Sequence, residues 1–178
     1  MKKNILIVLL IIISLVILAL VGFYFFNQPK TIKAVDSRNC TYSIEGENIT
    51  LKNGYGEGEL VPGSASKTIT QYFGNESSGD FNGDGLTDTA FILTQNTGGS
   101  GTFFYVAVAL ADISGCKGTN AVFLGDRIAP QNTEARNGSI IVNYADRKAD
   151  EPMVSSPTVG VSKYLVVENT TLKDVTPQ

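Results

Sequence analysis

The chain has 178 residues, a length that suits one folded domain plus an anchoring or targeting segment. Its formal net charge of −3 offers no electrostatic basis for binding nucleic acid. Histidine is absent, which excludes Ser-His-Asp and Cys-His catalytic arrangements and every histidine-containing zinc or iron site.

The N-terminal segment pairs a short basic start with a long apolar run. Lys2 and Lys3 precede residues 5–26, which carry no charge. At about 1.5 Å per residue, such a helix spans about 33 Å, enough to cross a hydrocarbon core of about 30 Å. A cleaved signal peptide is the alternative, but its apolar core is shorter and ends in small residues, whereas this run ends in aromatic ones. We therefore predict one transmembrane helix over residues 5–26.

The positive-inside rule then orients the chain. A stub of residues 1–4 lies in the cytoplasm, and everything after the helix lies outside, at the cell surface or in the periplasm. Residues 27–38 are polar, contain Pro29 and read as a tether. The folded domain is expected over residues 39–178.

The first half of this domain alternates short strand patterns with turns. Residues 41–44 and 48–51 flank Glu45-Gly46-Glu47 and predict a hairpin. Residues 53–58 are glycine-rich and predict a loop. Residues 67–73 are β-branched and aromatic, and they predict a strand that leads into an acidic segment.

The second half continues in the same way. Residues 103–110 are apolar on both faces, which favours the central strand of a sheet. Further strands are expected over residues 89–94, 121–124, 139–144, 159–167 and 171–175. Helical periodicity is hard to find outside the anchor. The predicted fold is therefore mainly β, an antiparallel sandwich or small barrel with one N-terminal transmembrane helix.

The acidic segment, residues 79–88, places oxygen-bearing side chains at alternate positions. Asp80, Asn82 and Asp84 offer side-chain oxygens, Leu86 offers its backbone carbonyl, and Asp88 closes the run. Ca²⁺ takes six to eight such oxygens at about 2.3–2.6 Å, and one short loop supplies most of them. We predict that these five residues hold one Ca²⁺. The alternative is an acidic turn that binds nothing.

The spacing differs from that of an EF-hand, which needs a glutamate at position 12 and two flanking helices. Position 12 is Phe91, within an apolar stretch typical of a buried strand. The Asp-x-Asn-x-Asp-Gly-x-x-Asp pattern over residues 79–93 resembles the calcium loop of FG-GAP/VCBS repeats in integrin-type propellers. A propeller is not expected here, because the chain has one such loop and no internal repeat.

Downstream blocks carry a second resemblance. They are residues 98–102, 118–131, 142–147, 151–153 and 159–164. Together with the loop, they resemble a family of uncharacterised extracytoplasmic bacterial proteins with a single FG-GAP-like loop. That resemblance implies a location and a fold but no established activity.

The two cysteines, Cys40 and Cys116, both fall on the predicted outer side of the membrane, where disulfides persist. We expect them to form a disulfide. Two buried free thiols are the alternative, because cysteine also packs as a small hydrophobic residue.

Charged residues outside the loop allow two interpretations. The Asp-Arg pairs at 126–127 and 146–147 end apolar strands, and Asp150 and Glu151 follow closely. They are either an acid/base pair for glycoside chemistry or a salt-bridged rim of the sheet. The rim is favoured, because nothing in the sequence indicates a cleft.

Three classes of function follow. The favoured one is a membrane-anchored extracytoplasmic calcium-binding domain, a binding or structural module of the envelope with a protein or glycan ligand and no catalytic residues. The alternative is an envelope inhibitor or accessory factor that inserts residues 149–158, which include Pro152 and Pro157. A hydrolase using Asp146, Asp150 or Glu151 is less favoured, so an enzymatic role is not expected.

Overall fold

The computed structural model describes residues 2–26, 35–59, 63, 66–113 and 115–177. The chain divides into two compact units, residues 1–32 and 33–178. The first contains α1 (Lys2–Phe26), whose described side chains are those of residues 12–24. Among the residues described at side-chain level, no helix is long and apolar enough to cross a membrane. Most of the predicted tether, residues 27–34, and the side chains of residues 5–11 and 25–26 of the predicted span lie outside the described part.

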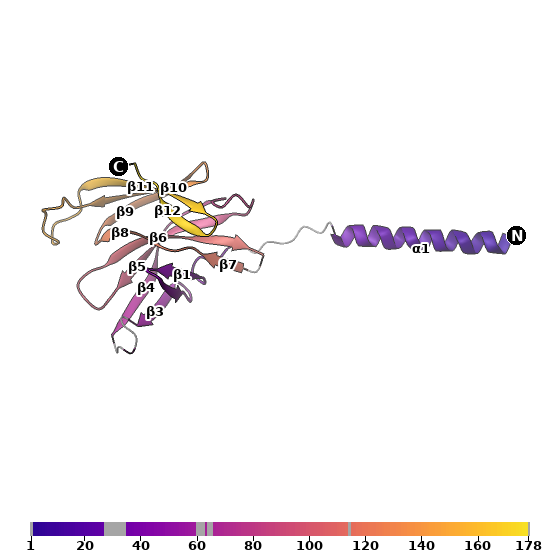
Figure 1. Cartoon of the computed structure of the whole chain (residues 1–178), viewed down its shortest axis with the longest axis horizontal. Helices are drawn as coiled ribbons and strands as arrows, with labels where there is room; N and C mark the ends of the chain where they lie inside the picture. Colours follow the sequence, from indigo (N-terminus) through magenta and orange to yellow (C-terminus); the bar gives the residue numbers. More distant parts are fainter. Residues whose placement is uncertain (1, 27–34, 60–62, 64–65, 114, 178) are drawn as a thin grey trace. The chain divides into compact units, whose positions relative to one another are not determined.

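The second unit is built from antiparallel β-strands (Figure 1). They are β1 (Thr41–Ile44), β2 (Glu47–Thr50), β3 (Tyr55–Glu59), β4 (Lys67–Gly79), β5 (Asp88–Asn96), β6 (Phe103–Asp112), β7 (Gly115–Gly118), β8 (Val122–Asp126), β9 (Ala129–Arg136), β10 (Ser139–Asp146), β11 (Val159–Glu168) and β12 (Thr171–Asp174). The prediction of a mainly β, antiparallel domain is confirmed.

The larger of the two main sheets is organised around β6. Its strands follow the order β3-β4-β5-β6-β7. β8 also pairs with β6, along residues 103–106, whereas β7 pairs along residues 109–112. Strand β6 is buried from Phe104 to Ala111. Both of its faces are apolar because both are covered, so the prediction of a central strand is confirmed.

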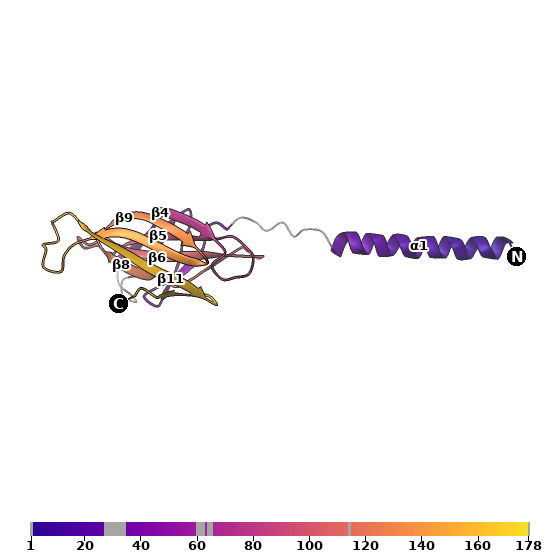
Figure 2. The same cartoon turned by 90° about the horizontal axis from the view of Figure 1, so that it is seen from above.

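A second sheet of four strands, in the order β12-β11-β10-β9, covers one face of the large sheet. Figure 2 shows β9 and β11 lying over β4–β6. Alternate residues of β5 and β6, such as Ile92 and Val106, pack in one cluster with Ile140, Val142 and Leu165 of the second sheet. This arrangement is an antiparallel sandwich.

The β1–β2 hairpin covers the opposite face and forms a third, smaller layer. Tyr42 and Ile44 pack in one cluster with Phe91 and Tyr105, which point to the other side of β5 and β6. The rings of Tyr42 and Phe91 meet edge to face at 5.2 Å. The hairpin is confirmed, with the two-residue turn Glu45-Gly46 between paired Ile44 and Glu47.

A disulfide joins this hairpin layer to the large sheet. Cys40 precedes β1 and is bonded to Cys116 of β7, with 5.7 Å between their Cα atoms. The predicted disulfide is confirmed, and the alternative of two free thiols is wrong.

The interpretation of residues 53–58 as a loop is correct only for Asn53 and Gly54, which form a turn with φ values of 53° and 83°, whereas residues 55–59 form β3. The glycines of β3 signal close packing. A Cβ built on Gly56 would lie 2.8 Å from the side chain of Ile49 and 3.0 Å from the carbonyl oxygen of Thr50. Only glycine lets β3 pass this close to the hairpin layer.

Candidate functional site

The acidic loop connects β4 to β5, and its side chains fold back onto its own backbone. Asp80 Oδ1 accepts hydrogen bonds from the amides of Gly83 at 2.7 Å and Asp84 at 3.2 Å. Asp80 Oδ2 accepts one from the amide of Gly85 at 2.9 Å. Gly83 and Gly85 have φ values of 79° and 81°, a region that favours glycine and lets the chain wrap around Asp80.

The next two polar residues continue the pattern. Asn82 Oδ1 accepts from the amide of Asp84 at 3.0 Å, and Asp84 Oδ1 accepts from the amide of Leu86 at 2.8 Å. The side chains of Asn82 and Asp84 also contact each other, because Asn82 Nδ2 donates to Asp84 Oδ2 at 2.9 Å. The alternating polar residues therefore lie along the inside of one turn.

Asp88 ties the loop to the core. Its side chain is fully buried. Oδ2 accepts from the amide of Phe81, near the start of the loop, and Oδ1 accepts from the amide of Ala111 in β6, both at 2.9 Å. Burial raises the pKa of Asp88; the two amides oppose this rise, and the charges of Asp84 and Asp80 add to it. The charges of Asp80 and Asp84 thus act on Asp88.

The chemistry of the predicted ligand set fits a hard cation, because every atom that would contact the metal is a carboxylate, amide or carbonyl oxygen. Asp80 Oδ1 accepts two amides, but Asp80 Oδ2 and the oxygens of Asn82 and Asp84 accept one hydrogen bond each and keep a second lone pair for a metal. Within the described ranges, however, no group of three or more Asp, Glu, His or Cys side chains is placed to hold a metal ion. The calcium site at Asp80, Asn82, Asp84, Leu86 and Asp88 therefore stays a prediction.

The two Asp-Arg pairs of the predicted rim lie close together but make different bonds. Arg127 bonds the carboxylate of Asp126 at 2.8 Å. Arg147 instead donates to carbonyl oxygens, those of Arg127 at 2.9 Å and Ser155 at 2.6 Å. The hydrogen bond from Arg127 lowers the pKa of Asp126; partial burial opposes this effect, and the charge of Arg147 adds to it.

Residues 147–158 form a loop whose base these bonds hold in place. Glu151 accepts from the amide of Lys148 at 3.0 Å, and the amide of Thr158 donates to the carbonyl of Asp146 at 2.9 Å. Asp146, Asp150 and Glu151 line neither the cavity beneath the β1–β2 hairpin nor the one beside Arg38 and Tyr72. This arrangement gives no support to a hydrolytic carboxylate pair, which must flank a bound glycosidic bond.

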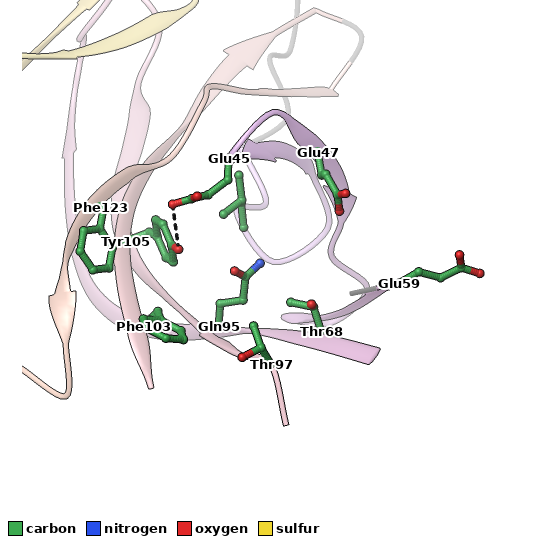
Figure 3. Close-up of a pocket in the computed structure, with 10 residues that line it drawn as sticks. Glu45, Glu47, Glu59, Thr68, Gln95, Thr97, Phe103, Tyr105 and Phe123 are labelled. Atoms are coloured by element: carbon green, nitrogen blue, oxygen red, sulfur yellow. Dashed lines mark hydrogen bonds between the residues drawn. The ribbon is translucent and has the colours of Figure 1, made fainter. Parts of the chain in front are cut away.

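The sequence interpretation missed a cavity of about 480 Å³ on the hairpin side of the large sheet (Figure 3). Phe103, Tyr105 and Phe123 form one wall, and Glu45 reaches toward them from the turn of the hairpin. The hydroxyl of Tyr105 donates to Glu45 at 3.2 Å. Burial, together with the charge and hydrogen bond of Glu45, raises the pKa of Tyr105 to about 12, which keeps the phenol protonated. One feature of the sequence could have pointed to this cavity. The two-residue hairpin turn has a glutamate before Gly46, at a position where asparagine is usual.

The fold and these sites define an antiparallel β-sandwich domain with an acidic loop at one strand connection and an aromatic cavity beneath a hairpin. No protein-family model, no curated protein and no solved structure matches this chain. Its function is therefore argued from its own residues.

Proposed function

We propose that this chain is a membrane-anchored, extracytoplasmic binding or structural module whose acidic loop holds one Ca²⁺. The observation that carries the proposal is the position of Asp88. Its buried carboxylate accepts amides from both the start of the loop and β6. A cation bound there would be joined directly to the central strand of the domain.

Asp80, Asn82 and Asp84 would supply side-chain oxygens to this ion, Leu86 its carbonyl oxygen, and Asp88 the closing carboxylate. The ion supplies positive charge among three carboxylates that otherwise repel one another. The chain's own contribution is to pre-arrange the ligands, because the turn already directs the oxygens of Asp80, Asn82 and Asp84 toward its interior amides.

The extracytoplasmic location rests on two independent features. Residues 5–26 carry no charge and follow Lys2 and Lys3, which favours an uncleaved anchor with the domain outside. The Cys40–Cys116 disulfide fits the same placement, because disulfides persist outside the reducing cytosol.

Calorimetric titration of the chelator-treated full chain tests the metal. We expect one Ca²⁺ to bind, with Mg²⁺ a poor substitute because it needs a tighter octahedral shell. At a hundredfold excess over Kd, binding to the folded state stabilises by about 2.7 kcal/mol, so the melting temperature should rise by several degrees. Asp84→Ala should abolish this stabilisation by Ca²⁺. Asp150→Ala, which removes an exposed carboxylate outside the acidic loop, should preserve it. Absence of binding at millimolar Ca²⁺ would show that the loop is only an acidic turn.

Membrane fractionation tests the anchor. The full chain should stay with membranes after a carbonate wash, and external protease should digest the part from Cys40 onward. Recovery of a soluble mature form that begins near Phe23 would identify a cleaved signal peptide instead.

One observation favours a second function, that of an envelope inhibitor or accessory protein. Val154 is 94% exposed in the loop of residues 147–158, next to Ser155, whose carbonyl oxygen accepts a hydrogen bond from Arg147. An exposed apolar side chain on a loop anchored by such a bond suits insertion into a partner's cleft. Cross-linking in envelope extract should then yield an enzyme complex with the wild type, and not with Val154→Ser.

A further inference from the structure

The cavity beneath the β1–β2 hairpin lies apart from the acidic loop and uses none of its residues. It is bounded by the ends of several strands of the large sheet and by the turn of the hairpin. With about 480 Å³ of space, it has room for a small organic group and not only for a metal ion. Its lining is therefore informative about the chemistry of a ligand.

One side of the cavity is aromatic. The rings of Tyr105 and Phe123 lie 5.3 Å apart, and those of Phe103 and Phe123 lie 6.4 Å apart. Tyr105 is buried, but Phe123 is 45% exposed, so part of its ring remains accessible. An accessible ring in a concave site offers a face to a ligand, and that face attracts cations.

The charge of the cavity has one sign. Glu45, Glu47 and Glu59 are the charged residues that line it, and no described lysine or arginine does so. The contributions of the three differ. Figure 3 shows Glu45 directed toward Tyr105, whereas Glu47 and Glu59 lie away from the aromatic wall. Glu59 also accepts the amide of Gly63, so Glu45 is the carboxylate that faces a ligand against the rings.

The backbone at Glu45 is unusual as well. Its φ is 53°, in the left-handed region, where the same chain places asparagine at Asn53, Asn137 and Asn169. Asparagine is the more compatible choice at such a position because its short polar side chain tolerates this conformation. The glutamate therefore brings a carboxylate to the cavity at a site where the turn itself favours another residue.

We propose that this cavity binds a ligand carrying an organic ammonium group, with Phe123 against the cation and Glu45 as its counter-ion. Phe103 and Tyr105 complete the aromatic wall, and the Tyr105 hydroxyl holds the Glu45 carboxylate in place. The polar side chains of Gln95 and Thr97 lie at the floor, where they suit the uncharged polar part of such a ligand. A free amine and a lysine side chain of a peptide share this chemistry.

Titration of the full chain in a maltoside detergent tests the proposal, because that detergent carries no ammonium group. The probes are choline, its neutral isostere 3,3-dimethylbutan-1-ol, and Nα-acetyl-lysine N-methylamide. We expect at least one cationic probe to bind with a millimolar or lower Kd, and the neutral isostere to bind at least tenfold more weakly. The preference between the two cationic probes identifies the source of the ammonium group.

Substitutions test whether the probes bind in this cavity. Glu45→Asn suits the left-handed turn and should keep the melting temperature while weakening binding about fivefold. Phe123→Leu should weaken binding about threefold through loss of the ring. Glu57→Gln removes the same charge from β3 outside the cavity and should leave Kd within twofold. The proposal is overturned if neither cationic probe binds at 20 mM, if the isostere binds equally well, or if Glu57→Gln and Glu45→Asn have equal effects.

Discussion

The disulfide between Cys40 and Cys116 gives the most quantitative prediction about stability. Replacing both residues by alanine removes the cross-link, and alanine suits the site because Cys40 is only 4% exposed. The bond closes a loop with a sequence separation of 76 residues. In the loop-entropy treatment, opening such a loop returns about 15 cal/mol/K to the unfolded chain, or about 4.5 kcal/mol at 25 °C.

The packing of the hairpin layer limits any additional loss. Tyr42 and Ile44 keep their places in the core because β1 still pairs with β2. The double variant should therefore fold, with a melting temperature lower by about 9–18 °C for a domain of this size. Thermal unfolding followed by circular dichroism measures the shift, and urea titration measures the free energy of unfolding.

Reductant provides the matched control. Wild-type protein with fully reduced thiols should melt close to the Cys40→Ala/Cys116→Ala variant, and the variant itself should not respond to reductant. A double variant within about 1 kcal/mol of the oxidised wild type would refute the reasoning. The hairpin layer would then be held by packing alone.

Two further predictions concern the β domain. A Cβ on Gly118 would lie 2.1 Å from the backbone oxygen of Thr41, so Gly118→Ala should cost about 3 kcal/mol or more, whereas Gly160→Ala, with open space around it, should cost less than about 1 kcal/mol in urea titrations. Partial burial raises the pKa of Asp174, but hydrogen bonds from a neighbouring threonine and Lys163 outweigh it and hold the pKa at about 2. Because this pKa lies below its unfolded value, the contribution to stability is present above about pH 4 and is lost as the pH falls toward 2. The side chain is 38% exposed, so screening reduces the contribution to about 1 kcal/mol; Asp174→Asn should lose this amount at pH 7 and almost nothing once the pH falls below about 2.

Strong local patterns made part of the fold predictable. The unbroken apolar run of β6 indicated a strand covered on both faces, and the turn at Glu45 and Gly46 indicated a hairpin. β9 was missed because it is an edge strand whose mostly polar residues leave no alternation to detect. Pro130 is tolerated in this edge strand because the register with β10 shifts at that point.

The two candidate sites also differ in whether a local sequence pattern predicts them. The acidic loop is contiguous in sequence, so its spacing alone predicted a ligand set, although the buried hydrogen bond from the amide of Ala111 to Asp88 depends on how β5 pairs with β6. The cavity joins Glu45 of the hairpin turn to Phe123 of β8, residues far apart along the chain. No local pattern connects them, because only the tertiary fold brings them together.

The position of the disulfide also determines how the domain carries a mechanical load. Tension applied between the N-terminal segment and the C-terminus enters the domain at Cys40 and passes through the sulfur atoms directly to Cys116. Residues 41–115 are then bypassed and cannot be drawn out while the bond is intact. The acidic loop and most of the cavity wall, including Glu45, lie within this shielded stretch. Under pulling, the strands after β7 yield first, so the acidic loop stays intact while the cavity loses Phe123 of β8.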